Sequence, residues 1–134
     1  MKKTTAIFLT LILGATMLAA CSAESATQNL TGKYVMISMK LDDDEYIDGV
    51  IEGLGEAPYI ELKSGNKLKS FMADYEGKPL TVNGTYKVKG DTITISYESG
   101  DSNEAKIEGT RITLEFDGDP DDSYEKSVMV YEKQ

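Results

Sequence analysis

The chain has 134 residues, with 14 Lys and Arg against 23 Asp and Glu, one Cys, no His, no Trp and a formal net charge of −9. This length allows one ordinary domain. Without His the chain cannot build a Ser-His-Asp triad, a Cys-His pair or a His-based zinc site, and a single Cys cannot form an internal disulfide. The acidic balance repels phosphate backbones, so we expect no nucleic-acid partner. We predict that the chain is not an enzyme and uses no cofactor.

The N-terminus has the layout of a secretory signal. Lys2 and Lys3 precede an apolar stretch at residues 6–20, and no acidic residue occurs before residue 21. The stretch has about fifteen residues, fewer than the roughly 20 that a membrane-spanning helix needs. We therefore predict that residues 1–20 are a signal peptide. Its removal takes away two lysines and no acid, which changes the net charge from −9 to −11.

Leu18, Ala19, Ala20 and Cys21 end this stretch and resemble the lipobox of bacterial lipoproteins. In that family the Cys thiol receives a diacylglyceryl group and a signal peptidase cuts just before the Cys. The resemblance implies that residues 18–20 are recognised by the peptidase and that Cys21 carries acyl chains such as palmitate, which anchor the protein to a membrane on its extracytoplasmic side. Residues 21–29 are then the lipidated Cys and a flexible tether. The alternative is an ordinary secretory signal that leaves a free cysteine.

From residue 30 onward, short segments alternate apolar and polar residues and are separated by turn residues, which is typical of β-strands. The predicted strands are residues 30–41, 58–63, 67–75, 80–89, 92–97, 104–109, 111–117 and 124–133. Within residues 42–56, apolar residues recur at spacings of three and four, which predicts one short helix. Because sequential strands leave open edges unless the sheet closes, we predict an all-β fold for residues 30–134: an eight-stranded antiparallel up-and-down barrel with one short helix. A two-sheet β-sandwich is the alternative.

Three stretches of this region are similar to the small lipocalin-like domains of bacterial lipoproteins. They are Leu30-Thr-Gly-Lys-Tyr34, Gly84-Thr-Tyr-Lys-Val-Lys-Gly-Asp-Thr-Ile93 and Gly109-Thr-Arg-Ile-Thr-Leu114. The resemblance implies a lipocalin-like barrel, in which these glycines mark bends or close approaches of strands and the tyrosines pack the barrel.

The alternation also predicts which side chains point into the barrel. This set is bulky for a domain of this size, so we expect a mostly filled interior. Its members are Ile60, Leu62, Phe71, Val82, Tyr86, Ile93, Ile95, Ile112, Leu114, Phe116, Val128 and Val130.

Two functions of different classes fit these features. The first is a membrane-anchored extracytoplasmic lipoprotein, not an enzyme, whose barrel binds a small apolar or amphipathic ligand. The alternative is an interaction module for another protein of the cell envelope, with a filled barrel and no ligand. A structural surface protein without a discrete site is a third possibility.

Acidic residues offer a candidate for calcium binding. Asp117, Asp119 and Asp121 have a spacing that could supply oxygen ligands, of which calcium takes six to eight. The segment lacks the glycine and the bidentate glutamate of an EF-hand loop, because Asp122 and Val128 stand at those positions. We otherwise predict no metal site and interpret the acidic residues as solvated loop charge.

Methionines and tyrosines are the remaining candidates for binding. Thioethers can bind copper(I), but the methionines at 36, 39, 72 and 129 are scattered along the chain, which favours a role in filling the core. Tyrosines could stack on a ring-shaped ligand, although strands favour aromatic residues in any case. The tyrosines considered are Tyr46, Tyr59, Tyr75, Tyr97, Tyr124 and Tyr131.

Overall fold

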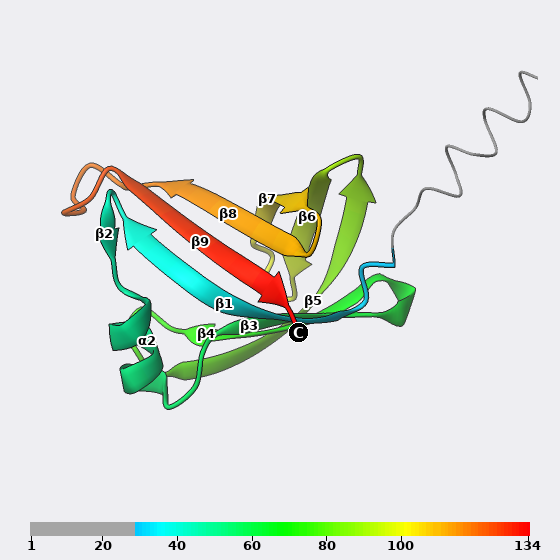
Figure 1. The fold of residues 1–134 in the computed structure, drawn as a ribbon, viewed down its shortest axis with the longest axis horizontal. Helices are drawn as coiled ribbons and strands as arrows, with labels where there is room; N and C mark the ends of the chain where they lie inside the picture. The colour runs from blue at the N-terminus through cyan, green and yellow to red at the C-terminus, as the bar shows by residue number, and fades with distance from the viewer. Residues whose placement is uncertain (1–28) are drawn as a thin grey trace, which may run out of the picture. The chain divides into compact units, whose positions relative to one another are not determined.

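A computed structural model describes residues 29–134 and arranges them as a barrel of antiparallel strands (Figure 1). The predictions of a signal peptide, of peptidase recognition at Leu18, Ala19 and Ala20, and of lipidation at Cys21 concern residues outside this described part. Within residues 29–134, no helix has the length and apolar character needed to cross a membrane.

The barrel wall consists of eight strands that pair in sequence order and then close. In chain order the elements are β1 (Gly32–Leu41), β2 (Asp44–Glu45), helix α2 (Ile47–Leu54), β3 (Tyr59–Lys63), the short 3-10 turn η1 (Ser64–Asn66), β4 (Lys67–Ala73), β5 (Pro79–Lys89), β6 (Thr92–Tyr97), β7 (Ser102–Glu108), β8 (Arg111–Asp117) and β9 (Lys126–Lys133). β9 pairs with β1, which closes the sheet, whereas the two-residue β2 pairs only with the end of β1. The predicted eight-stranded barrel with one short helix is confirmed, and the sandwich alternative is wrong.

The two ends of the barrel differ. The closed end is the end where β1 begins and where the tight turns β3–β4, β5–β6 and β7–β8 lie. Its interior is filled by buried side chains, which include Tyr34, Leu62, Ile93 and Ile112. The Tyr86 hydroxyl, also buried there, donates a hydrogen bond to the Lys63 carbonyl oxygen at 3.2 Å. At the open end lie α2 and the connections β4–β5, β6–β7 and β8–β9.

Helix α2 lies at the open end, beside β1 (Figure 1). It ends at Gly55, whose left-handed backbone (φ 81°) lets its N–H donate to the Ile51 carbonyl oxygen at 2.8 Å. The corner before the helix is held by Glu45. Its carboxylate accepts hydrogen bonds from the Ser38 hydroxyl and the Met39 N–H, both at 2.7 Å, and these bonds lower the pKa of Glu45. None of the residues of α2 is fully buried.

The face of β4 that points inward differs from the prediction. The turn at residues 64–66 contains two left-handed residues, Gly65 and Asn66, and it pairs Leu62 with Leu68. This register puts Leu68, Ser70 and Met72 on the inner face. Phe71 is therefore on the outer face, where its ring stacks on that of Tyr59 with centroids 5.5 Å apart. The prediction that Phe71 points inward is wrong, because the turn geometry and not the apolar pattern determines the register.

The inward face of β9 also differs from the prediction. Met36 is opposite Tyr131 but Ser38 is opposite Val130, so Ile37 is an extra residue in a bulge of β1. Met129 and Tyr131 line the interior, and the prediction that Val128 and Val130 do so is wrong. Residues 128–131 are all apolar, so alternation could not distinguish the two faces of this strand.

Gly84 allows a close approach of β5 and β6. A side chain at this position would place its Cβ against the carbonyl oxygen of Ser96 on the neighbouring strand. This agrees with the role that the resemblance implied for the glycine.

Candidate ligand-binding site

The open half of the barrel contains a cavity of about 940 Å³. This volume lies at the upper end of the range for small-molecule sites, roughly 300–1,000 Å³. The lining is mostly apolar. Every strand except β2 contributes to it, and so do helix α2 and two of the connections. The lining residues are Met36, Met39, Val50, Pro58, Ile60, Met72, Ala73, Leu80, Thr81, Val82, Tyr97, Glu98, Ser99, Asp101, Ser102, Asn103, Leu114, Phe116, Met129 and Tyr131.

The expectation of a mostly filled interior is therefore wrong for this half of the barrel. The bulky side chains Tyr34, Leu62 and Tyr86 gather at the closed end, where they are buried. Toward the open end, β4 contributes Met72 where Phe71 was expected, and β9 contributes Met129 where valines were expected. Bulk is thus distributed unevenly along the barrel axis, and the open half is left hollow.

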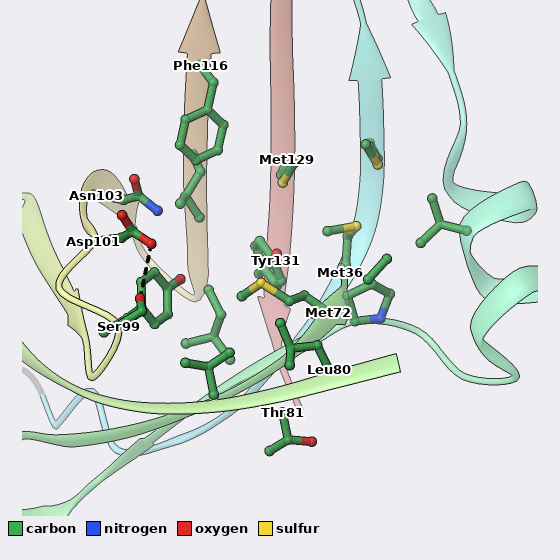
Figure 2. A pocket seen from close by; sticks show the side chains of 18 of the residues that line it. Met36, Met72, Leu80, Thr81, Ser99, Asp101, Asn103, Phe116, Met129 and Tyr131 are labelled. Carbon is green, nitrogen blue, oxygen red and sulfur yellow. Dashed lines mark hydrogen bonds between the residues drawn. The ribbon is translucent and has the colours of Figure 1, made fainter. Parts of the chain in front are cut away.

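All four methionines of the described residues line this cavity. Figure 2 shows Met36, Met72 and Met129 around it, from three different strands, and Met39 follows Met36 on β1. A thioether side chain is unbranched, polarisable and adaptable, which suits contact with apolar ligands of varied shape. Their scattered positions in the sequence had favoured a role in filling the core. The sequence could have predicted that these methionines lie together only if the inward faces of β4 and β9 had been assigned correctly.

The half-buried Tyr97 and the buried Tyr131 supply neutral polar groups to the cavity. Burial raises the pKa of Tyr97, and hydrogen bonds with the side chains of Asn103 and Ser70 lower it in part. Tyr131 is 5% exposed, and burial, with a smaller contribution from Tyr97, raises its pKa strongly. Both phenols therefore stay protonated at neutral pH and can donate a hydrogen bond without bringing a charge into the cavity.

The charged side chains that line the cavity are Glu98 and Asp101, in the turn between β6 and β7. The turn is held by the Tyr97 N–H, which donates to the Asp101 carbonyl oxygen at 2.9 Å, and by the Ser99 hydroxyl, which donates to Asp101 Oδ2 at 3.0 Å (Figure 2). The Glu98 N–H donates to the carbonyl oxygen of Asn83 on β5 at 3.0 Å. Among the lining residues there is no Lys and no Arg.

The calcium candidates Asp117, Asp119 and Asp121 are not brought together as ligands. Asp117 ends β8, while the Asp119 N–H donates to Asp122 Oδ2 at 2.8 Å within the following loop. Across residues 29–134, no group of three or more His, Cys, Asp or Glu side chains is arranged to hold a metal ion.

The tyrosines considered for ring stacking do not form one site. Tyr97 and Tyr131 line the cavity, but Tyr59 lies on the outer face with the Lys33 ammonium 4.1 Å from its ring centroid, and Tyr75 is 96% exposed in the β4–β5 turn. Only two of the six thus contribute to the cavity.

Several solved structures are similar to this chain. A lipocalin-like protein from Bacteroides uniformis is 15% identical, with a TM-score of 0.49, and the match covers 78% of this chain and 98% of that chain. An uncharacterized protein from Bacteroides eggerthii is 12% identical, with a TM-score of 0.47, and covers 79% and 100%. The fatty-acid-binding protein isolated from Manduca sexta is 14% identical, with a TM-score of 0.38, and covers 78% and 99%.

Sequence comparisons give a family but no characterised relative. No curated protein matches the chain. The family model for the lipocalin-like domain matches residues 30–116, which is more than half of the chain and covers the barrel from β1 through all but the last residue of β8. The chain belongs to the lipocalin-like domain family.

Proposed function

We propose that this chain is a binding protein, not an enzyme, that holds a small apolar or amphipathic ligand inside its barrel. The observation that carries the proposal is the cavity of about 940 Å³ with a mostly apolar lining at one end of an otherwise filled barrel. A mostly apolar cavity of this size favours an apolar ligand, because binding removes apolar surface of both the ligand and the lining from water.

The alternative of a filled barrel that acts only through its outer surface has less support. The large apolar side chains that are exposed within residues 29–134 are dispersed, on β1, before α2, in the β4–β5 turn and near both ends of β5. They are Ile37, Tyr46, Tyr75, Leu80 and Val88. Dispersed apolar residues are ordinary on a soluble protein and do not indicate a partner.

A cavity-filling substitution tests ligand binding. Val82 and Val88 both lie on β5, but Val82 lines the cavity whereas Val88 is 43% exposed and does not. We expect Val82→Trp to reduce binding of the uncharged fluorescent probe N-phenyl-1-naphthylamine at least tenfold, and Val88→Trp to leave it unchanged. Equal binding by both variants, each folded by circular dichroism, would show that the probe does not occupy the cavity.

We also propose that Cys21 anchors the protein to the extracytoplasmic side of a membrane, at the cell membrane or outer surface. The support is the lipobox-like Leu18-Ala19-Ala20-Cys21. The order of the strands is compatible with an anchor that precedes β1. The chain enters β1 at the closed end of the barrel, whereas the cavity lies at the opposite, open end.

Labelling with radioactive fatty acid tests the anchor. In cells that process lipoproteins, Cys21→Ala should abolish the label and release the protein from the membrane fraction, whereas Ser25→Ala in the same segment should keep both. A labelled Cys21→Ala protein would contradict the anchor and would leave the ligand proposal untouched.

A further inference from the structure

The open end of the barrel is strongly acidic. Its four connections, at residues 42–58, 74–78, 98–101 and 118–125, contain one basic residue, Lys78, whose ammonium lies 2.9 Å from Glu76 Oε2. The acidic residues of the same connections are Asp42, Asp43, Asp44, Glu45, Asp48, Glu52, Glu56, Asp74, Glu76, Glu98, Asp101, Asp119, Asp121, Asp122 and Glu125.

The lysines on the adjoining strand ends do not reverse this charge. Lys126, at the start of β9, has its ammonium 2.9 Å from Glu115 Oε2. Lys40, near the end of β1, is opposite Glu45 in the β1–β2 pairing. A ligand that approaches the cavity therefore passes a field that attracts cations and repels anions.

The cavity itself has the same preference. Glu98 and Asp101 contribute negative charge to its lining, Tyr97 and Tyr131 contribute neutral hydroxyls, and no lining residue is basic. A carboxylate or phosphate brought into the cavity would lose its hydration without gaining a positive partner. An ammonium group would gain two carboxylates, and an uncharged polar group could use the phenols.

We propose that the cavity selects apolar ligands with a cationic or uncharged polar group and rejects anionic amphiphiles such as fatty acids. This inference rests on the proposed function. The apolar part occupies the methionine-lined interior, and the cationic group lies by the β6–β7 turn near Glu98 and Asp101. Selection is a difference between ligands of equal apolar area, so it depends on the lining charges and not on the size of the cavity.

Isothermal titration calorimetry with three ligands of one chain length tests this selection. The ligands are decyltrimethylammonium and decanoate, each below its micelle concentration, and decan-1-ol below its solubility limit, all at low salt. We expect decyltrimethylammonium to bind at least tenfold more tightly than decanoate, with decan-1-ol between them, and 0.5 M NaCl to narrow the difference. Decanoate binding as tightly as decyltrimethylammonium would overturn the selection while sustaining the proposed function. No saturable binding of any of the three would overturn the proposed function itself.

Neutralising the two lining carboxylates tests where the selection arises. Glu98→Gln with Asp101→Asn should reduce the preference for decyltrimethylammonium over decanoate at least threefold and should change the affinity for decan-1-ol less than the affinity for either ion. The matched control is Glu104→Gln with Glu108→Gln, two exposed positions on β7 that do not line the cavity and whose neutralisation removes the same charge from the molecule. An equal reduction in both double variants would show that net charge, not Glu98 and Asp101, produces the preference, and would overturn this part of the proposal.

Discussion

Two buried serines in the barrel differ in their hydrogen bonding. Ser70 is 1% exposed and its side chain hydrogen-bonds to Tyr97. Ser127 is 3% exposed, and its hydroxyl oxygen is buried without a hydrogen-bond partner among the described residues. In the β9 pairing, Ser127 lies between Leu41 and Phe116, so its neighbours on the sheet are apolar. An unpaired buried hydroxyl costs about 1–3 kcal/mol of desolvation, so these two serines should affect stability in opposite directions.

We expect Ser127→Ala to raise the free energy of unfolding by about 1 kcal/mol, because it removes a polar group that gains nothing in the fold. Ser70→Ala should lower the free energy of unfolding by about 1 kcal/mol, because it removes one of the two side chains that hydrogen-bond to Tyr97. Urea denaturation of both variants measures the two changes. Destabilisation of equal size in both would mean that the Ser127 hydroxyl has a partner in the folded protein.

Helix α2 has few stabilising features of its own. It has eight residues, no side-chain cap at its N-terminus and two internal glycines, and its Val50 lines the cavity. Each internal glycine costs about 1 kcal/mol of helix stability relative to alanine. A Cβ at Gly49 or Gly53 would meet no atom within 4 Å, so alanine fits at both positions.

Gly49→Ala and Gly53→Ala should each slow hydrogen exchange of the α2 amides about fivefold, since each adds about 1 kcal/mol to helix stability. Amide exchange followed by NMR measures this effect. Gly55→Ala is the contrasting variant, because its left-handed backbone (φ 81°) is strained for alanine, and it should speed exchange instead. If none of the three substitutions changed the exchange rates, local opening of α2 would not be the step that limits exchange of its amides.

The positions of the elements could be predicted from the sequence more reliably than their inward faces. Alternation and turn residues located the eight wall strands and the short helix, because these patterns are local. The inward face of β4 depended on the turn at Gly65 and Asn66, and the inward face of β9 on its pairing with β8, which sets Met129 opposite Leu114. The bulge at Ile37 in β1 likewise shows no sign in the sequence, since a bulge is a property of the pairing with a distant strand.

At the scale of the whole molecule, the two ends of the barrel have different compositions. The closed end is filled and its strand ends carry basic residues, among them Lys63, Lys67 and Lys89, whereas the open end is hollow and acidic. The total charge was evident from composition, but its division between the ends required the strand order. A list of inward residues could not predict the cavity either. The number of strands determines the width of the barrel, but the register of the strands determines where the large side chains lie along its axis.

The central claim is that an apolar ligand occupies the open half of the barrel. Every methionine of residues 29–134 lines that space, at positions 36, 39, 72 and 129. Protein labelled with carbon-13 in the methionine methyl groups therefore reports on the cavity by NMR. Titration with decan-1-ol should shift these four resonances together and to saturation, with a single dissociation constant. If the four resonances did not shift at concentrations at which calorimetry shows that decan-1-ol binds, the claim that the cavity is the binding site would be contradicted.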